Sequence, residues 1–255
     1  MLPVYQPSAP DAACPARRYR SDLDVGGLCD NGGMNAQPSL DPTVVRWSVP
    51  PAERAGRPVL VLLHGYGSDE HDLFALVPHL PEAFVVASVR APLAPPWPTP
   101  GASWYPIEGL DGRDPEAITL AAHAVLAWAR EAVGEEPVGL LGFSQGGAVA
   151  LQTLRVDPDA VSFAVVLAGY AAGGELPGDA LLANRRPPVF WGRGAADDVI
   201  PAALVDVTAQ WLPVHSELSG RVYPGLTHSI SQDELDDVRA FLDARLADRG
   251  TTASG

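Results

Sequence analysis

The fold is decided by one stretch of the sequence, Val138-Gly-Leu-Leu-Gly-Phe-Ser-Gln-Gly-Gly147. Its apolar first half is typical of a buried parallel strand, and the small residues after Ser144 are typical of a helix that packs closely on that strand. A serine at such a junction stands on a sharp turn that exposes its hydroxyl, and Gly142 and Gly146 leave room for the turn. The stretch therefore predicts a nucleophile elbow at Ser144.

Strand and helix patterns alternate on both sides of this elbow. Apolar and β-branched runs predict strands over residues 43–49, 58–63, 83–89, 137–141, 162–168, 188–191 and 217–223. Helices are predicted over residues 71–77, 115–133, 146–154, 202–212 and 232–248. This alternation predicts an α/β protein with a mostly parallel central sheet and helices on both faces.

Capping patterns place several of the helix ends. Asp114 and Pro115 fit the N-cap and first-turn positions of the second helix, and Gly134 is suited to end it. Ser68 and Asp69 are suited to cap the short first helix. Ser231-Gln-Asp-Glu234 has the pattern of a capping box at the start of the last helix.

Length and composition indicate one catalytic domain between two peripheral segments. At 255 residues and 47% hydrophobic content, the chain is able to bury one substantial core, which we place at residues 41–248. Residues 1–40 follow neither a helical nor a strand period and predict a disordered leader, with Met34 as an alternative start of the native protein. Residues 249–255 are predicted to be a flexible tail.

The charge and the residue types exclude several classes of function. The net charge is −14 and all 17 basic residues are arginines scattered along the chain, which argues against binding to nucleic acid. No apolar run approaches the roughly 20 residues of a membrane span, so no stable membrane insertion is expected. Cys14 and Cys29 form no metal-ligand pattern, and no metal or cofactor is expected. We expect a cytoplasmic monomer or homodimer.

A histidine and a carboxylate must accompany a nucleophilic serine, because the histidine takes its proton and the carboxylate orients the histidine. In a doubly wound sheet these residues lie on loops at the carboxyl ends of strands. Asp197 follows one predicted strand and His228 follows the last. We place Asp197 in the triad and assign the neighbouring Asp198 to a solvated or helix-capping position.

Hydrolysis also requires N–H donors that face the oxyanion of the tetrahedral intermediate. One donor is expected to be the backbone N–H of Gln145, at the start of the helix after Ser144. The other is assigned to the N–H of Tyr66, in the glycine-rich loop that begins at His64. His64 itself is expected to hold this loop by hydrogen bonds.

A proline-rich segment with several aromatic residues, residues 91–113, is predicted to be a long functional loop. Trp104 is the first choice for a residue that lines the acyl or alcohol site, followed by Tyr105 and Trp97. A packing role for a buried aromatic residue is the alternative.

The sequence resembles the phospholipase/carboxylesterase family of α/β-hydrolases, which includes bacterial carboxylesterases and acyl-protein thioesterases. The matching motifs are Leu63-His-Gly-Tyr-Gly-Ser-Asp-Glu70, Gly142-Phe-Ser-Gln-Gly-Gly147, the loop over residues 194–201, and Gly225-Leu-Thr-His-Ser229. The resemblance implies an α/β-hydrolase fold without a large lid domain and a cofactor-free serine hydrolase. It also implies that Ser144, Asp197 and His228 form the triad and that the N–H groups of Tyr66 and Gln145 form the oxyanion hole.

The expected reaction is hydrolysis of a small carboxylic ester through an acyl-enzyme. Two alternatives remain at this point. The same triad would serve a lysophospholipase or an acyl-protein thioesterase, and a protein of this fold that only binds its ligand would belong to a different functional class.

Overall fold

A computed structural model describes residues 38–107 and 113–252 of the chain. The predicted leader therefore lies outside the described residues, except for a few positions at its end. Among these, Leu40 is buried in the core, so the packed domain starts slightly earlier than predicted. The last helix continues to Thr252, four residues beyond its predicted end, so the predicted tail at residues 249–252 is helical.

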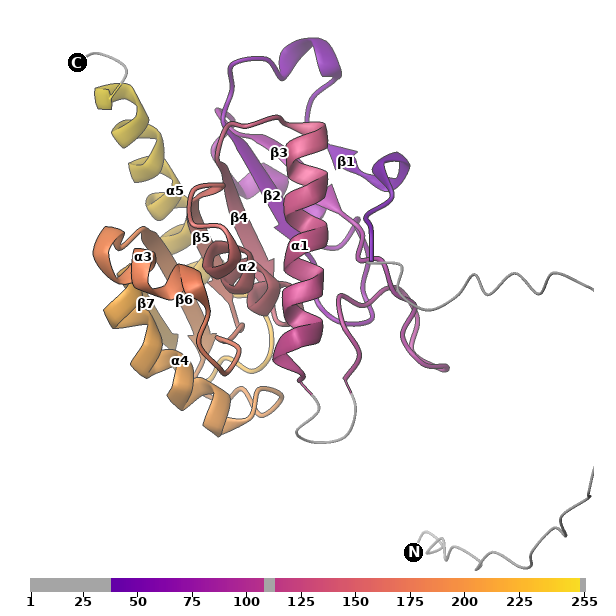
Figure 1. Ribbon diagram of the computed structural model, residues 1–255, viewed down its shortest axis with the longest axis vertical. Coiled ribbons are helices and arrows are strands. Elements are labelled where there is room, and N and C mark those ends of the chain that lie inside the picture. The colour runs from indigo at the N-terminus through magenta and orange to yellow at the C-terminus, as the bar shows by residue number, and fades with distance from the viewer. Residues whose placement is uncertain (1–37, 108–112, 253–255) are drawn as a thin grey trace, which may run out of the picture. The chain divides into compact units, whose positions relative to one another are not determined.

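A seven-stranded sheet forms the centre of the domain, with the strand order β1-β3-β2-β4-β5-β6-β7 (Figure 1). The strands are β1 (Arg46–Trp47), β2 (Val59–Leu63), β3 (Val85–Val89), β4 (Val138–Phe143), β5 (Val161–Leu167), β6 (Pro188–Gly194) and β7 (Glu217–Tyr223). Only the edge strand β1 is antiparallel to its neighbour, β3, and all other pairs are parallel. The mostly parallel sheet is as predicted.

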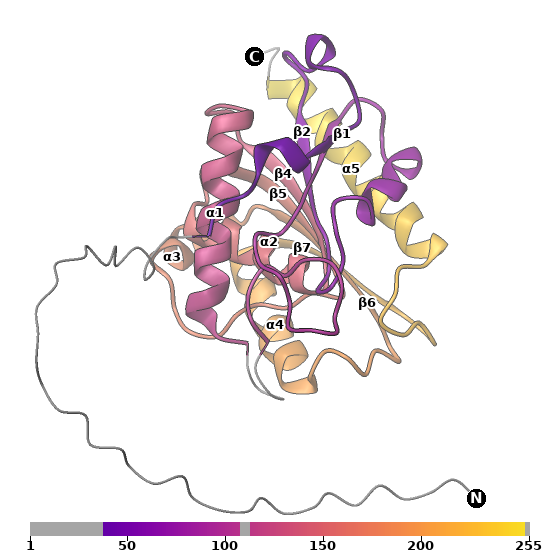
Figure 2. The ribbon, with the colours of Figure 1, turned by 90° about the vertical axis from the view of Figure 1, so that its right-hand side faces the viewer.

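Helices cover both faces of this sheet (Figure 2). The α-helices are α1 (Pro115–Ala132), α2 (Gln145–Val156), α3 (Pro177–Arg185), α4 (Ala202–His215) and α5 (Gln232–Thr252), and the 3₁₀ helices are η1 (Pro42–Val44), η2 (Pro51–Glu53) and η3 (Leu73–His79). Alternate residues of β2 show the two layers: Val61 and Leu63 pack with α1 and α2, and Leu60 and Leu62 pack with η3 and α5. Such a strand is apolar on both faces because both are covered.

Several local predictions are corrected by the structure. The predicted strand at residues 43–49 overlaps the end of η1 and includes a β1 of only two residues, and the predicted helix at 71–77 is largely the 3₁₀ helix η3, with Pro78 inside it. Asp72 is the N-cap of η3, whereas Asp69 instead accepts the N–H of His71 at 2.9 Å. Helix α3 was not predicted, because its nine residues follow a glycine- and proline-rich segment without a clear helical period.

Of the two hydrogen bonds that define the predicted capping box at α5, one is present and the other is missing. Ser231 Oγ accepts the N–H of Glu234 at 3.2 Å. The carboxylate of Glu234 does not return a bond to Ser231, and both of its oxygens are buried without a partner among the described residues. Burial raises the pKa of Glu234 to about 7.

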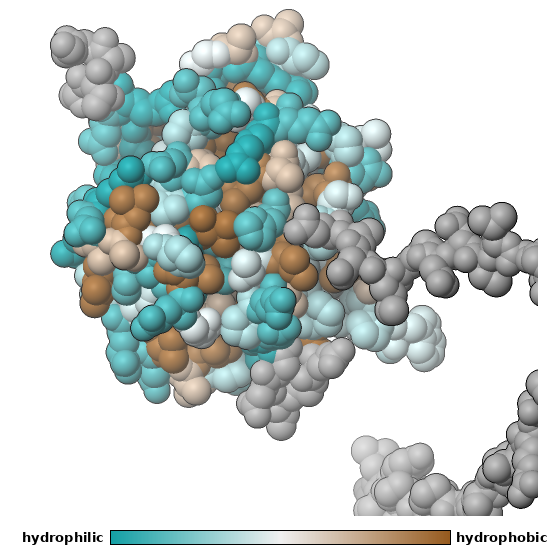
Figure 3. Space-filling view, viewed as in Figure 1, coloured by the Kyte–Doolittle hydropathy of each residue, from teal (hydrophilic) through white to brown (hydrophobic). Residues whose placement is uncertain are grey.

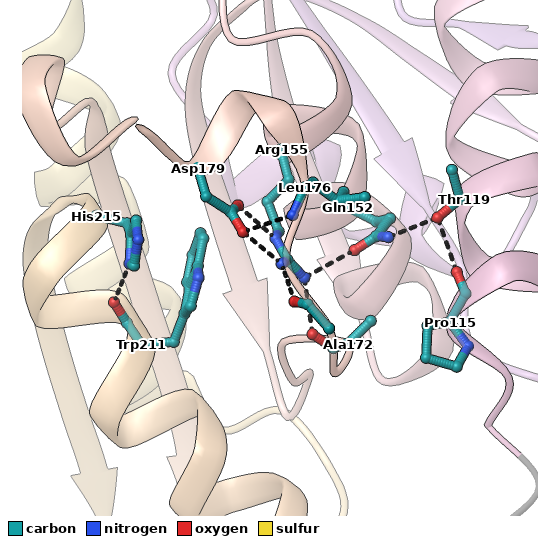
Figure 4. A network of polar contacts seen from close by, with 10 residues as sticks. Pro115, Thr119, Gln152, Arg155, Ala172, Leu176, Asp179, Trp211 and His215 are labelled. Atoms are coloured by element: carbon teal, nitrogen blue, oxygen red, sulfur yellow. Dashed lines mark hydrogen bonds and ion pairs between the residues drawn. The ribbon is translucent and has the colours of Figure 1, made fainter. Parts of the chain in front are cut away.

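A buried arginine on α2 connects the helices that cover one face of the sheet (Figure 4). The guanidinium of Arg155 binds the carboxylate of Asp179 on α3 with two bonds of 2.8 and 2.7 Å, and it lies over the ring of Trp211 on α4. It also contacts Gln152, which donates to Thr119 on α1 at 2.7 Å. Because α2 begins next to Ser144, this network also fixes the helix that supports the elbow.

Candidate active site

Ser144 lies between β4 and α2 in a strained backbone conformation, with φ 54° and ψ −115°. Its backbone N–H donates to the carbonyl of Leu167 at 2.8 Å, at the end of the neighbouring strand β5. A residue other than glycine at positive φ is uncommon and requires support from its surroundings. Here the turn presents the serine side chain above the sheet, as expected for a nucleophile elbow.

The two flanking glycines are required by the close approach of backbone segments. A Cβ atom at Gly142 would lie 2.2 Å from the carbonyl oxygen of Gly146. A Cβ atom at Gly146 would lie 1.9 Å from the carbonyl oxygen of Leu63, at the end of β2. Neither position has room for a methyl group, so the geometry of the elbow depends on both glycines.

Three side chains from separate loops form a chain of hydrogen bonds. His228, in the loop after β7, contacts Ser144 Oγ with Nε2 at 2.8 Å and Asp197 Oδ2 with Nδ1 at 2.8 Å. Because a carboxylate only accepts, Nδ1 carries the proton, and Nε2 is free to accept the hydroxyl proton of Ser144. Asp198, the alternative acid, has an exposed side chain.

The environment of Asp197 favours its charged form. Burial works against ionisation, but hydrogen bonds from His228 and from the N–H groups of Val199 and Ile200 outweigh it and lower the pKa of Asp197. The loop that carries Asp197 is also tied to the loop that carries His228, since the N–H of Ala196 donates to the carbonyl of Leu226 at 2.9 Å. A fixed, charged Asp197 can therefore hold the His228 ring in one orientation.

Both predicted oxyanion donors lie at the cavity that contains Ser144. Gln145 is the first residue of α2, where backbone N–H groups have no acceptor within the helix. Tyr66 comes from the loop after β2. His64 holds this loop, as predicted, because its Nε2 accepts the N–H of Ala91 at 3.1 Å and its Nδ1 contacts the carbonyl of Gly65 at 2.7 Å. Burial lowers the pKa of His64.

The structure does not place the three predicted aromatic residues at this cavity. Trp104 and Tyr105 are fully buried, and Trp97 is 93% exposed. Trp104 Nε1 donates to the carbonyl of His64 at 2.8 Å, and its N–H donates to Gln145 Oε1 at 2.9 Å. Trp104 therefore supports the start of the loop that carries Tyr66 and the first residue of α2, and the prediction of substrate contact is corrected to a supporting role.

The cavity beside Ser144 has a volume of about 260 Å³ and contains residues that the sequence did not single out. Its apolar wall comes from Ile107, Phe143, Val199 and Ile200. Its additional polar residues are Ser68, Asp72, Arg113 and Tyr170. They come from five separate segments, and no local pattern indicates that such residues converge.

A larger cavity of about 380 Å³ lies at the opposite, amino-terminal ends of β2 and β4. Two of its arginines are already engaged: Arg54 lies over the ring of Trp47 at 3.8 Å, and Arg57 donates to several backbone carbonyls. We place the functional site in the smaller cavity because it contains Ser144 and His228.

One group of adjacent metal-ligating side chains occurs among the described residues. Ligand atoms of Asp69, Glu70 and His71 lie within 4.8 Å of one another, but His71 already contacts both carboxylates. These residues do not line the cavity beside Ser144. The hydrogen-bonded chain at Ser144 contains no such group.

Comparison with known proteins identifies the family of the chain. A model of the phospholipase/carboxylesterase family matches residues 46–246, which include the elbow, Asp197 and His228. The chain belongs to the phospholipase/carboxylesterase family. The match therefore covers nearly all of the packed domain.

Relatives in this family include acyl-protein thioesterases. The chain is 33% identical to acyl-protein thioesterase 1 of Saccharomyces cerevisiae over 116 residues, which are 44% of this chain and 51% of the yeast protein. It is 26% identical to acyl-protein thioesterase 1 of Gibberella zeae over 228 residues, 77% of this chain and 94% of that protein. The alignment with the yeast protein thus spans about half of its length.

Solved structures that resemble this chain have the same fold. The crystal structure of esterase PE8 is 26% identical, with a TM-score of 0.63, and the match covers 82% of this chain and 99% of that one. The Bacillus cereus carboxylesterase, at 20% identity, has a TM-score of 0.67 over 78% of this chain and 93% of that one. These likenesses establish the α/β-hydrolase fold.

The apolar character of the helices and of the surface was compared with what membrane binding requires. No helix in the described part of the chain is both long and apolar enough to span a membrane. The face drawn in Figure 3 is mainly hydrophilic, with hydrophobic residues in small scattered groups. This mainly hydrophilic face is consistent with the net charge of −14.

Proposed function

We propose that this protein is a serine hydrolase that cleaves carboxylic esters, with Ser144 as nucleophile, His228 as general base and acid, and Asp197 as the residue that orients His228. The observation that carries the proposal is the continuous chain of two 2.8 Å hydrogen bonds from Ser144 through His228 to Asp197 at a cavity. Membership in the phospholipase/carboxylesterase family supports it.

In the proposed reaction, His228 Nε2 takes the Ser144 proton while Oγ attacks the carbonyl carbon of the ester. The N–H groups of Tyr66 and Gln145 stabilise the resulting oxyanion. The protonated Nε2 then donates to the leaving alcohol, which leaves an acyl-enzyme. Water attacks this acyl group by the same steps in reverse, with His228 again as base. The chemistry uses only side chains and backbone groups of the chain, without a cofactor.

The size of the cavity favours small esters. At about 260 Å³ it lies below the usual range of about 300–1,000 Å³ for sites that hold drug-sized ligands. The thioesterase names of several relatives favour a second candidate, an acyl-protein thioesterase or a lysophospholipase, in which a longer acyl chain would extend past this cavity. Cytoplasmic localisation and a monomeric or homodimeric state remain predictions.

A hydrolysis panel of p-nitrophenyl esters from acetate to palmitate, with one thioester beside them, tests the proposal. We expect the highest kcat/KM for short acyl chains. Ser144→Ala should fold normally and lose turnover, whereas Ser162→Ala, a matched change at an exposed serine of β5, should keep it. Full activity of Ser144→Ala would refute the assignment, and a maximum at palmitate or at the thioester would favour the second candidate.

Covalent labelling addresses the non-catalytic alternative directly. A fluorophosphonate probe should modify Ser144 in the native protein and not in the Ser144→Ala variant. The probe reacts only with a serine whose proton a neighbouring base can take. Absence of an adduct on the folded native protein would favour a binding protein of this fold over an enzyme.

A further inference from the structure

We propose that the cavity beside Ser144 selects esters that carry a carboxylate, and that Arg113 binds this second charged group. The inference rests on the proposed function and specifies its substrate class. It follows from the position of Arg113, from the absence of a counter-charge beside it among the described residues, and from the neighbouring hydroxyl of Tyr170.

Arg113 lies just before α1 and lines the same cavity as Ser144 and His228. Its side chain is half-buried, and its guanidinium carbon lies 5.5 Å from the centre of the Tyr170 ring. Its guanidinium interacts with the hydroxyl of Tyr170 and makes one long hydrogen bond, from a terminal nitrogen to the carbonyl of Val199 at 3.5 Å. Its Nε is buried and has no acceptor among the described residues. A buried donor without an acceptor is unfavourable unless a ligand completes it.

No carboxylate in the described part of the chain lies within 4.0 Å of the Arg113 guanidinium. The nearby carboxylates that belong to the described residues have other partners. Asp72 accepts the hydroxyl of Ser68 at 2.7 Å, Asp197 accepts from His228, and Asp114 accepts the N–H of Glu116 at 3.0 Å. In a protein of net charge −14, a cavity arginine that forms no ion pair with any described carboxylate is well suited to bind an anionic ligand group.

Tyr170 supplies a second donor beside Arg113. Its hydroxyl is 2.5 Å from that of Tyr105, which is completely buried and has no other hydroxyl partner in the described structure. Burial raises the pKa of both phenols, so both keep their protons. Tyr105 must therefore donate to Tyr170, which leaves the Tyr170 proton for an acceptor on the cavity side. A guanidinium and a hydroxyl together match a carboxylate, which only accepts hydrogen bonds.

The remaining wall of the cavity indicates which kind of linker joins the carboxylate of the substrate to its ester group. Ile107, Val199 and Ile200 are apolar, so a short methylene chain fits between the two polar ends. A cavity of about 260 Å³ limits this chain to a few carbons. The matching substrates are half-esters of short dicarboxylic acids, or acyl esters of short hydroxy acids. They share a carboxylate and differ in which side of the ester bond carries it.

The test compares charged and neutral esters of similar length. One arm uses monomethyl adipate against methyl hexanoate, and the other uses 4-acetoxybutanoate against butyl acetate, so the two arms distinguish a charge on the acyl side from one on the alcohol side. The measured quantity is the kcat/KM of the charged ester divided by the kcat/KM of the neutral ester. In at least one arm, Arg113→Gln should lower this ratio by about 10- to 100-fold. Arg113→Lys should retain part of the selectivity and Tyr170→Phe should lower it. Arg221→Gln, at an exposed arginine of β7, should leave both kcat/KM values unchanged.

A structural role for Arg113 would lower all rates together and would leave the ratio unchanged. A ratio that is the same in native protein and in Arg113→Gln, in both arms, would overturn the inference and leave the proposed hydrolase function intact. If Arg113→Gln does not fold, the native ratio is measured against salt. It should fall between low and high ionic strength, and a constant ratio would overturn the inference.

Binding of adipate itself separates failure of the inference from failure of the proposed function. Isothermal titration should detect adipate binding to native protein, and this binding should be weaker by about 10-fold or more in Arg113→Gln. If no ester is hydrolysed, the proposed function fails, and adipate binding that depends on Arg113 would still support the anion site. Equal adipate binding by both proteins, or no binding by either, would overturn the site.

Discussion

Glu234 allows a quantitative test of the structure through the pH dependence of stability. Its side chain is 1% exposed at the start of α5, against Gly192 of β6, and neither carboxylate oxygen has a partner among the described residues. Burial raises its pKa from the ordinary value of 4.5 to about 7, and the charge of Asp237 adds to this effect, whereas Ser231 opposes it. Glu234→Gln removes the ionisation and keeps the size of the side chain.

The sign and size of the effect follow from proton linkage. A folded pKa above the unfolded one means that the folded state holds the proton more tightly, so the stability contributed by neutral Glu234 is fully present below pH 4.5 and is lost as pH rises towards 7. Since one pKa unit corresponds to about 1.4 kcal/mol, the loss amounts to about 3 kcal/mol. This is a large part of the roughly 5–15 kcal/mol that stabilises a typical domain.

Urea unfolding followed by circular dichroism, at several values between pH 4 and pH 8, measures this effect. Glu234→Gln should gain about 3 kcal/mol relative to native protein across this range, most of it between pH 4.5 and 7. Asp243→Asn, a matched change at an exposed position of α5, should show no comparable gain. A difference between Glu234→Gln and native protein that does not change with pH would refute the assignment of an unpaired, buried carboxylate.

Three further predictions concern the elbow, the buried arginine and the proposed acid of the triad. Gly146→Ala should abolish ester hydrolysis and lower stability by several kcal/mol, whereas Gly173→Ala, where a Cβ meets no atom within 4 Å, should be neutral in both assays. Arg155→Met should lower the free energy of unfolding in urea by about 3–5 kcal/mol, because it leaves the partly buried Asp179 carboxylate without its partner; a loss under 1 kcal/mol would contradict this role. Asp197→Asn should lower kcat by about 10⁴-fold and keep the fold. A kcat close to that of native protein would refute the role of Asp197. The folded pKa of Asp197 is lowered, so the stability that this residue contributes is present above its unfolded pKa and is lost as pH falls through its folded pKa. The free energy of unfolding of Asp197→Asn should therefore depend less on pH in the acid range than that of native protein.

Much of the fold could be predicted because its signals are local. Apolar runs such as Val59–Leu63 form strands covered on both faces, and Asp114 caps α1 through the N–H of Glu116 as its sequence pattern indicates. Helix α3 lacks such a signal. Its position depends on the bidentate contact of Asp179 with Arg155, 24 residues earlier in the chain, which no local period reveals.

The aromatic residues show where local reasoning fails. Trp104 and Trp97 lie in the same proline-rich loop and have similar sequence surroundings, yet one is 1% and the other 93% exposed. Which of them faces the core depends on hydrogen bonds of the loop with His64 and Gln145, which belong to other segments. A tryptophan in such a loop is therefore a poor guide to substrate contact on its own.

The sequence by itself determined the alternation of strands and helices, the elbow at Ser144, and the strand ends that carry Asp197 and His228. These features depend on short-range periodicity and on the rule that parallel strands bring their carboxyl ends to one edge. Only the tertiary structure decided the lining of the cavity, the position of Arg113 in it and the burial of Glu234. Burial and pairing depend on segments far apart in the chain, so a side chain's charge and neighbours are defined only once those segments have packed together.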